Sequence, residues 1–212
     1  MNIQRLEFNM FGENTYIVWD NESKQSAVID PGMINRAECA ALDNFIAENN
    51  LIVKYIICTH LHVDHVFGVK YIKDKYNAEL YADRSDEFLA ERIGQQLRMF
   101  HLPIDLDSIK IDHYIKHGDV LHLGNQTLEI ISVPGHSPGS VAIYDRKDNA
   151  VITGDALFQG GIGRTDLPGG DYAMLINAIK KNLLTLPSET KVYPGHGPSS
   201  TIGFEKHNNP YL

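Results

Sequence analysis

The spacing of apolar positions changes several times along the chain, and these changes predict the order of strands and helices. Three strands are predicted near the start, at residues 3–10, 15–19 and 27–29, and the last ends at the turn-forming Asp30-Pro31-Gly32. A helix is predicted over residues 36–48, because apolar side chains recur there at helical spacing. Residues 51–58 are nearly all apolar, which is typical of a strand buried on both faces.

The rest of the chain repeats this alternation. The pattern predicts a helix at 66–76, a strand at 79–82, short strands within 111–133, a hairpin joining 141–144 to 151–153, a helix at 171–186 and a strand at 191–193. Residues 83–100 leave two interpretations open: a helix packed by its apolar stripe, or a lid over a site. Both halves give strands followed by a helix, and no linker divides them. We therefore expect one α/β domain over residues 1–212, a sandwich of two sheets between helices.

Composition narrows the class of partner. The 212 residues are 43% hydrophobic, which is ample for a large core, and 19 basic against 27 acidic residues give a net charge of −8. This balance disfavours a nucleic-acid surface. The first residues lack the layout of a signal peptide and no apolar run is long enough to span a membrane, so we expect a cytoplasmic protein without a membrane partner. Cys39 and Cys58 are expected to be reduced.

The candidate chemistry is concentrated in residues 59–65, Thr-His-Leu-His-Val-Asp-His, between the buried strand and the next helix. Imidazole and carboxylate groups are ligands for divalent cations, and open α/β sheets place their ligands at such strand ends. Six residues cannot easily wrap one ion with all four side chains. The spacing favours two neighbouring ions, with His60 and His62 on one and Asp64 and His65 on the other. The alternative is a structural cluster of a capping Asp and buried histidines.

Three later residues follow the same local design of a strand end, a glycine-containing turn and a potential ligand: His136, Asp155 and His196. The glycines let the backbone turn tightly and let side chains converge without clashes. Seven ligands suit two ions. The first ion is assigned His60, His62 and His136, and the second Asp64, His65 and His196, while Asp155 bridges the two.

These residues, in this order and with Gly68 after the first motif, resemble the metallo-β-lactamase fold superfamily over residues 13–198. The resemblance implies an αββα sandwich of two mixed β-sheets flanked by helices, with a dinuclear site at one edge of the sheets. A bridging Asp155 departs from true β-lactamases, so β-lactam hydrolysis is not expected. The segments 163–166 and 194–198 resemble glyoxalase II-like hydrolases, and the tail 204–212 resembles the end of a short bacterial subgroup.

The resemblance implies a metal-dependent hydrolase of small thioesters, of the S-2-hydroxyacylglutathione type. A metal-bound hydroxide would attack the acyl carbonyl, and Asp64 would orient it as a catalytic residue as well as a ligand. Zinc is the first expectation for the two divalent ions, and iron and manganese also accept these ligands. Glyoxalase II proper continues into a helical region that binds glutathione, whereas this sequence stops at Leu212. The resemblance therefore supports thioester hydrolysis more strongly than it supports glutathione as the thiol carrier.

Three alternative functions remain open. Persulfide dioxygenases resemble this sequence too, and their single iron would fall here to His60, His136 and Asp155. A phosphodiesterase and a non-catalytic metal-binding protein are the other two. The Arg164 and Asp166 side chains could form an ion pair that holds their loop or could contact substrate, and Asp30 could support a ligand imidazole or only form a turn. Five other histidines are expected to be surface or buried residues without a ligand role: His101, His113, His117, His122 and His207. Three tyrosines are expected to serve in packing: Tyr16, Tyr144 and Tyr172. Residues 159–163 are expected to form a flexible loop.

Overall fold

The apolar run after residue 50 forms β4 (Ile52–Ile57), an inner strand of a six-stranded sheet in the computed structural model, which describes residues 2–104, 106 and 108–212. The sheet has the order β1–β2–β3–β4–β5–β6. Its other strands are β1 (Asn2–Phe8), β2 (Glu13–Trp19), β3 (Gln25–Ile29), β5 (Glu79–Ala82) and β6 (His113–Tyr114). The first three strands are antiparallel and β3 to β6 are parallel, so the carboxyl ends of the parallel strands meet at one edge.

The second sheet has the order β14–β13–β10–β9–β8–β7. Its strands are β7 (Val120–Leu123), β8 (Gln126–Ser132), β9 (Val141–Asp145), β10 (Ala150–Gly154), β13 (Lys191–Pro194) and β14 (Ser200–Thr201). The predicted hairpin is β9–β10, and only β10 and β13 pair in parallel. Both sheets are therefore mixed, as the resemblance implied.

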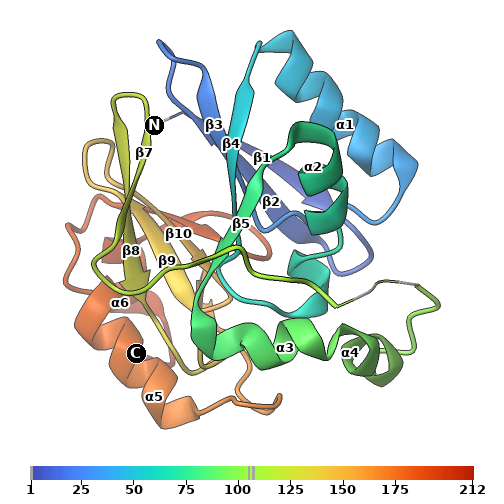
Figure 1. The fold of residues 1–212 in the computed structure, drawn as a ribbon. Coiled ribbons are helices and arrows are strands. Elements are labelled where there is room, and N and C mark those ends of the chain that lie inside the picture. Colours follow the sequence, from blue (N-terminus) through green and yellow to red (C-terminus); the bar gives the residue numbers. More distant parts are fainter. Residues whose placement is uncertain (1, 105, 107) are drawn as a thin grey trace.

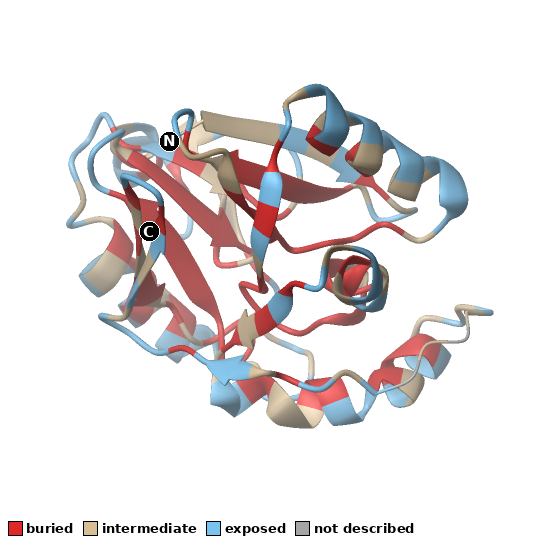
Figure 2. Ribbon diagram, turned by 45° about the horizontal axis from the view of Figure 1, so that its top comes forward, coloured by how far each residue is buried: buried red, intermediate tan, exposed pale blue. Residues whose placement is uncertain are grey.

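Three apolar clusters separate the layers. Tyr16, Ile29 and Ile57 of the first sheet meet Leu128 and Ile143 of the second, and all five are buried. The helices α1 (Arg36–Glu48) and α2 (Val69–Tyr76) cover the outer face of the first sheet, and α5 (Tyr172–Ala178) and α6 (Ile202–Asn208) cover the second (Figure 1). The inner strands β2, β3, β9 and β10 are almost wholly buried, while the helices expose one side (Figure 2). The αββα sandwich is confirmed.

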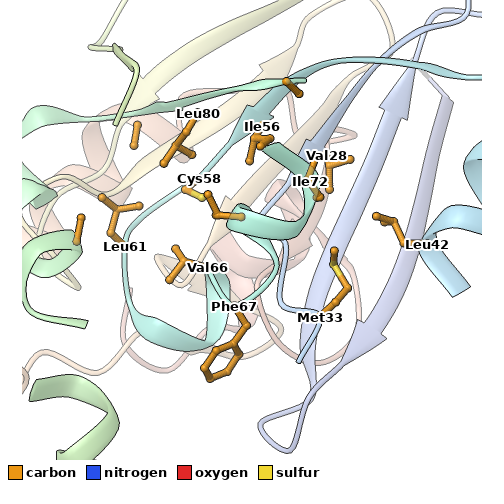
Figure 3. Packing of buried hydrophobic residues seen from close by; sticks show 14 of the residues in the cluster. Val28, Met33, Leu42, Ile56, Cys58, Leu61, Val66, Phe67, Ile72 and Leu80 are labelled. Carbon is orange, nitrogen blue, oxygen red and sulfur yellow. The ribbon is translucent and has the colours of Figure 1, made fainter. Parts of the chain in front are cut away.

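Burial of branched apolar side chains holds α1 and α2 on the first sheet. Leu42 of α1 and Ile72 of α2 point toward Val28, Ile56 and Leu80 of the strands (Figure 3). All five are fully buried. Burial of each such side chain stabilises the fold by roughly 1.5–3 kcal/mol. This packing holds in place the sheet edge from which the loop 59–65 emerges.

The helix predicted to start at residue 66 starts at Val69 instead. Residues Val63–His65 form a single 3₁₀ turn, and the backbone N–H of Gly68 donates to the Pro31 carbonyl at 2.7 Å. A Cβ at Gly68 would lie 2.6 Å from Cε of Met33 and 3.1 Å from the Pro31 carbonyl oxygen, so a larger residue here would require the Met33 side chain to shift. Asp64 and His65 therefore sit on a separate turn rather than at the start of the helix.

Three further segments differ from the pattern. Residues 83–100 form a 3₁₀ turn (Arg84–Asp86), α3 (Glu87–Glu91) and α4 (Ile93–Met99), with a break at Arg92. The predicted helix 171–186 consists of α5 and a π-helical turn, Ile179–Leu183. The prediction of a flexible loop at 159–163 is wrong, because β11 (Leu157–Phe158) and β12 (Gly161–Ile162) pair there as a small hairpin. Among the described residues, no helix combines the length and apolar character needed to cross a bilayer.

Candidate metal centre

Loops that follow β4, β8, β10 and β13 converge at one edge of the sandwich and carry all seven predicted ligands. His60, His62 and His136 form one group, named here the inner cluster. Asp64, His65 and His196 form a second, the outer cluster. Within each group the potential ligand atoms lie within 4.8 Å of one another. The structure thus brings together both predicted sets.

The inner cluster is buried, each imidazole being at most 5% exposed. His62 Nδ1 lies 2.9 Å from His136 Nε2. His136 Nδ1 lies 2.7 Å from the Arg164 carbonyl, so it donates there and leaves Nε2 unprotonated. The Thr59 hydroxyl donates to Asp30 at 2.6 Å and lies 3.0 Å from His60 Nδ1, which must therefore be protonated. The His136 and His60 rings thus each present an unprotonated Nε2.

The outer cluster is more open, since the Asp64 and His196 side chains are 17% and 26% exposed. His196 Nε2 lies 3.3 Å from Asp64 Oδ2 and 3.3 Å from His65 Nε2. His196 Nδ1 donates to the Phe11 carbonyl at 3.1 Å. His65 Nδ1 lies 3.2 Å from Asp30 Oδ2, so Asp30 stands beside a ligand imidazole, in the position proposed for it from the sequence.

Asp155 lies between the two clusters. Its Oδ1 is 3.5 Å from His65 Nε2, and its Oδ2 is 3.7 Å from His136 Nε2 and 3.5 Å from His196 Nε2. Glycine permits this crowding: a Cβ at Gly195 would lie 2.1 Å from Asp155 Oδ1, and one at Gly154 would lie 2.2 Å from the Thr59 hydroxyl. The predicted role of glycine beside these ligands is confirmed at both positions.

Electrostatics favour the cation-binding form of His62 and Asp155 but not that of His65. Burial and the neighbouring His136 lower the pKa of His62 to about 3, so this imidazole is neutral at pH 7. Burial opposes ionisation of Asp155, but His65, His136 and His196 together outweigh burial and lower the pKa of this carboxyl well below its usual value. Burial lowers the pKa of His65, but the Asp155 and Asp64 carboxylates have the larger combined effect. The pKa of His65 is therefore well above its usual value.

Two buried atoms test whether these residues fit metal ions. His60 Nε2 and Asp155 Oδ1 are both buried and have no hydrogen-bond partner. A buried polar atom without a partner costs about 1–3 kcal/mol, and each of these atoms faces the other ligands. Divalent cations at the two clusters would satisfy both atoms, because imidazole nitrogen and carboxylate oxygen are their usual donors. The residues present therefore fit metal ions at both clusters.

Two supporting residues were missed by the sequence analysis, and both come from the segment 83–100. Asp86 accepts hydrogen bonds from the backbone N–H groups of Leu61 at 3.1 Å and Gly139 at 2.7 Å, and from the Ser137 hydroxyl at 2.7 Å. Burial raises the pKa of Asp86 above its usual value. Gln96 accepts from the Val63 N–H at 2.9 Å. These contacts clamp the backbone on both sides of His62 to the loop of His136.

A cavity of about 230 Å³ lies over the ligands. Its other walls include Phe11 and Phe100, whose rings meet edge to face 5.8 Å apart, and Leu167. Arg164 also borders the cavity and forms two 2.7 Å hydrogen bonds with Asp166. The ion pair therefore exists, and it stands beside the site.

The remaining histidines and tyrosines lie elsewhere. Among the residues that the structure describes, neither cluster nor the cavity includes His101, His113, His117, His122, His207, Tyr16, Tyr144 or Tyr172. Tyr16 is buried and donates to the Pro194 carbonyl at 2.6 Å, whereas Tyr172 is exposed. Both cysteines are free, and Cys58 is buried.

Comparison with known proteins agrees with this geometry. The family model described as the metallo-beta-lactamase superfamily matches residues 9–196. The chain is 38% identical over 214 residues to a hydroxyacylglutathione hydrolase, GloC, from Haemophilus influenzae, and the match covers 100% of this chain and 98% of the relative.

Two solved structures are similar over nearly their whole length. The BLEG-1 B3 metallo-beta-lactamase has a TM-score of 0.90 and 32% identity, covering 100% of this chain and 99% of its own. TTHA1623 in a di-iron-bound form has a TM-score of 0.86 and 35% identity, covering 99% of this chain and 100% of its own.

Proposed function

The chain is a metallo-hydrolase of the metallo-beta-lactamase superfamily, and from this premise we propose that it hydrolyses small thioesters at a dinuclear centre in a single domain, residues 1–212. The position of Asp155 carries the proposal, because its two oxygens face the inner and outer clusters from between them. The inner cluster would hold one divalent ion, the outer cluster the other, and Asp155 would bridge them. Zinc is our first choice of metal.

Two bound cations would supply a water of lowered pKa and positive charge for the developing oxyanion. The chain's own residues do the rest. Asp64 Oδ2 lies at the cavity wall, where it can orient the attacking water and take its proton. Phe11, Phe100 and Leu167 shield the reacting atoms from bulk water.

The substrate class rests on similarity and on the site together. The similarity to a hydroxyacylglutathione hydrolase supports a thioester of the S-2-hydroxyacylglutathione type. No separate nucleophilic side chain is required, and among the described residues no serine or cysteine lines the cavity. An open cavity of about 230 Å³ suits a small molecule.

The first experiment is metal analysis by elemental mass spectrometry on protein purified without a metal-chelating tag, followed by a substrate panel. We expect two ions per chain and hydrolysis of thioesters, including S-lactoylglutathione. Oxygen uptake with glutathione persulfide by protein holding one iron would replace the proposal with the dioxygenase. Preferential hydrolysis of a phosphodiester or of the β-lactam nitrocefin would also overturn it.

Asp64→Asn tests the role of this carboxylate. We expect the fold to remain and, at metal concentrations that fill both sites, thioester turnover to fall at least about a hundredfold, because an amide cannot take a proton. The control is Asp74→Asn, which changes an exposed carboxylate on α2 that pairs only with Lys70 among the described residues. Unchanged turnover in fully metallated Asp64→Asn would exclude the assignment.

A further inference from the structure

A second cavity, of about 70 Å³, adjoins the cavity over the metal ligands. It lies between the segment of α3 and α4 and the Leu167–Pro168 turn. His62, Phe100 and Leu167 border both cavities. The two cavities therefore adjoin at these three side chains, and the smaller one lies on the side of the inner cluster. We call it the side pocket.

The side pocket is lined mainly by apolar side chains: Phe88, Leu89, Met99, Phe100, Leu167 and Pro168. Gln96 also borders it, but this amide already donates to the Leu61 and Leu89 carbonyls and accepts from Val63. His62 is the buried polar wall residue and is assigned to the inner ion, and the remaining polar wall residues, Arg92 and Gln95, are exposed. A hydroxyl placed deep in the pocket would lose its water without gaining a partner, which is unfavourable.

The walls are held in place before any substrate arrives. Gln96 ties α4 to the backbone beside His62, and Asp86 ties the start of α3 to the loop of His136. On the opposite side, Gly169 packs so closely that a Cβ there would lie 3.3 Å from the Phe88 ring. A preformed pocket favours a ligand without a cost of reorganisation.

Size decides which end of a thioester fits. The side pocket, of about 70 Å³, is less than a third as large as the cavity of about 230 Å³ over the ligands, so it suits a short chain only. A peptide thiol carrier is several times larger and must stay in the wider cavity near Arg164. We propose that the side pocket binds the acyl chain of the substrate and selects short aliphatic acyl groups over acetyl and lactoyl groups.

This inference rests on the proposed thioesterase function and is tested on one carrier. The rate constant kcat/KM is measured for acetyl-, lactoyl-, butanoyl- and hexanoyl-glutathione. We expect butanoyl- and hexanoyl-glutathione to exceed the acetyl and lactoyl thioesters by at least about tenfold, since burying extra methylene groups in an apolar pocket gives discrimination of this size. Hydrolysis of the whole series without this preference overturns the inference alone. Hydrolysis of none overturns the proposed function.

A pocket-filling variant locates the preference. Gln95→Trp places a large ring at the exposed wall, and we expect the hexanoyl-to-acetyl ratio of kcat/KM to fall at least about tenfold. Arg98→Trp is the matched control, since Arg98 is exposed on the same helix and does not border the pocket. Thermal unfolding of both variants checks folding. Equal ratios in the two variants would contradict the assignment.

A structural measurement does not depend on turnover. The probe is the ketone analogue of hexanoyl-glutathione, in which a methylene group replaces the sulfur. In a crystal structure with this analogue we expect the aliphatic chain to contact Phe88 and Met99. A chain that instead points to solvent past Phe11, while the carrier occupies the side pocket, would reverse the proposed orientation and overturn it.

Discussion

The two clusters of the metal centre differ in composition, exposure and support. The inner cluster is three buried imidazoles, held through backbone contacts by Asp86, Gln96 and the Arg164 carbonyl. The outer cluster contains a carboxylate, and its Asp64 and His196 side chains are partly exposed. Its supports come from other elements: the Asn9 side chain and the Phe11 carbonyl of the turn at residues 9–12, and Asp30 beside His65.

This difference indicates a division of work within one site. A closed, neutral cluster restrains an ion, whereas an open cluster with a carboxylate offers positions for water and a proton acceptor. We therefore expect the outer ion to be bound more weakly and the outer residues to take part more directly in the reaction. The following experiments test this difference, beginning with the largest effect.

Graded removal of metal should have the largest effect. Dialysis against rising concentrations of a chelator is expected to remove one ion per chain first and the second only later, because the outer cluster is reached by solvent. Hydrolysis should fall to background with the first ion. Metal content by elemental mass spectrometry and activity are measured on the same samples. Simultaneous loss of both ions would contradict the difference between the clusters.

Thr59→Val should weaken both clusters, and the inner one more. The Thr59 hydroxyl contacts His60 directly but reaches His65 only through Asp30. We expect metal affinity at the inner cluster to fall about a hundredfold, the upper range for a lost supporting hydrogen bond. Competition with a chromogenic chelator measures both affinities. Thr59→Ser keeps the hydroxyl and should have the metal affinities of the unchanged protein. If Thr59→Ser binds metal as weakly as Thr59→Val, loss of the hydrogen bond is excluded as the cause.

Asp86→Asn should act on the inner cluster alone. An amide nitrogen would replace one of the two carboxylate oxygens that accept the Leu61 and Gly139 N–H groups. The amide N–H group would then face a buried backbone N–H group, and neither could accept a hydrogen bond from the other. We expect the free energy of unfolding to fall by about 1–3 kcal/mol and the inner-site affinity by about thirtyfold. Denaturant unfolding and metal competition measure these. The control is Glu91→Gln, an exposed carboxylate on the same segment; similar losses there would refute a specific clamp.

Asn9→Gly should give the smallest effect, confined to the outer cluster. The Asn9 amide donates to the Asp64 and Gly32 carbonyls at 3.1 and 3.0 Å, and its φ of 51° is one that glycine adopts freely. We expect a loss of outer-site affinity of about tenfold. Asn50→Gly is the matched control, with a φ of 52° at an exposed position after α1. Weakening of the inner site by Asn9→Gly would show that the clusters are not independent.

The candidate ligands that the structure brings together could be found from the sequence because they are marked locally. His60, His62, Asp64 and His65 lie within six residues, and His136, Asp155 and His196 each follow a strand end and a glycine. The strand β4 was also marked by its largely apolar run, but the predicted burial on both faces holds only at its carboxyl end, because Ile52 and Lys54 are exposed. The layers followed from the alternation of strands and helices.

The supporting contacts could not be predicted in the same way, because they join positions distant in sequence. Asp86 is one charged residue in a charged segment, and only the fold brings it to Gly139, 53 positions later. Gln96 lies on a helical stripe that predicts packing, yet its amide holds the backbone at Val63. The start of α2 was misplaced for a similar reason: Gly68 is held by the Pro31 carbonyl rather than by a helical partner.

The order of the ligands along the chain has a consequence for biosynthesis. Four ligands are made by residue 65, but the outer cluster is complete only when His196 joins Asp64, 132 positions later, after β13 has paired with β10. A chain still on the ribosome therefore exposes His60, His62 and His65 to passing cations without the geometry that selects among them. Selective metal loading at the outer cluster therefore has to follow synthesis of His196, which makes the metal supply after that point a determinant of which ions the protein receives.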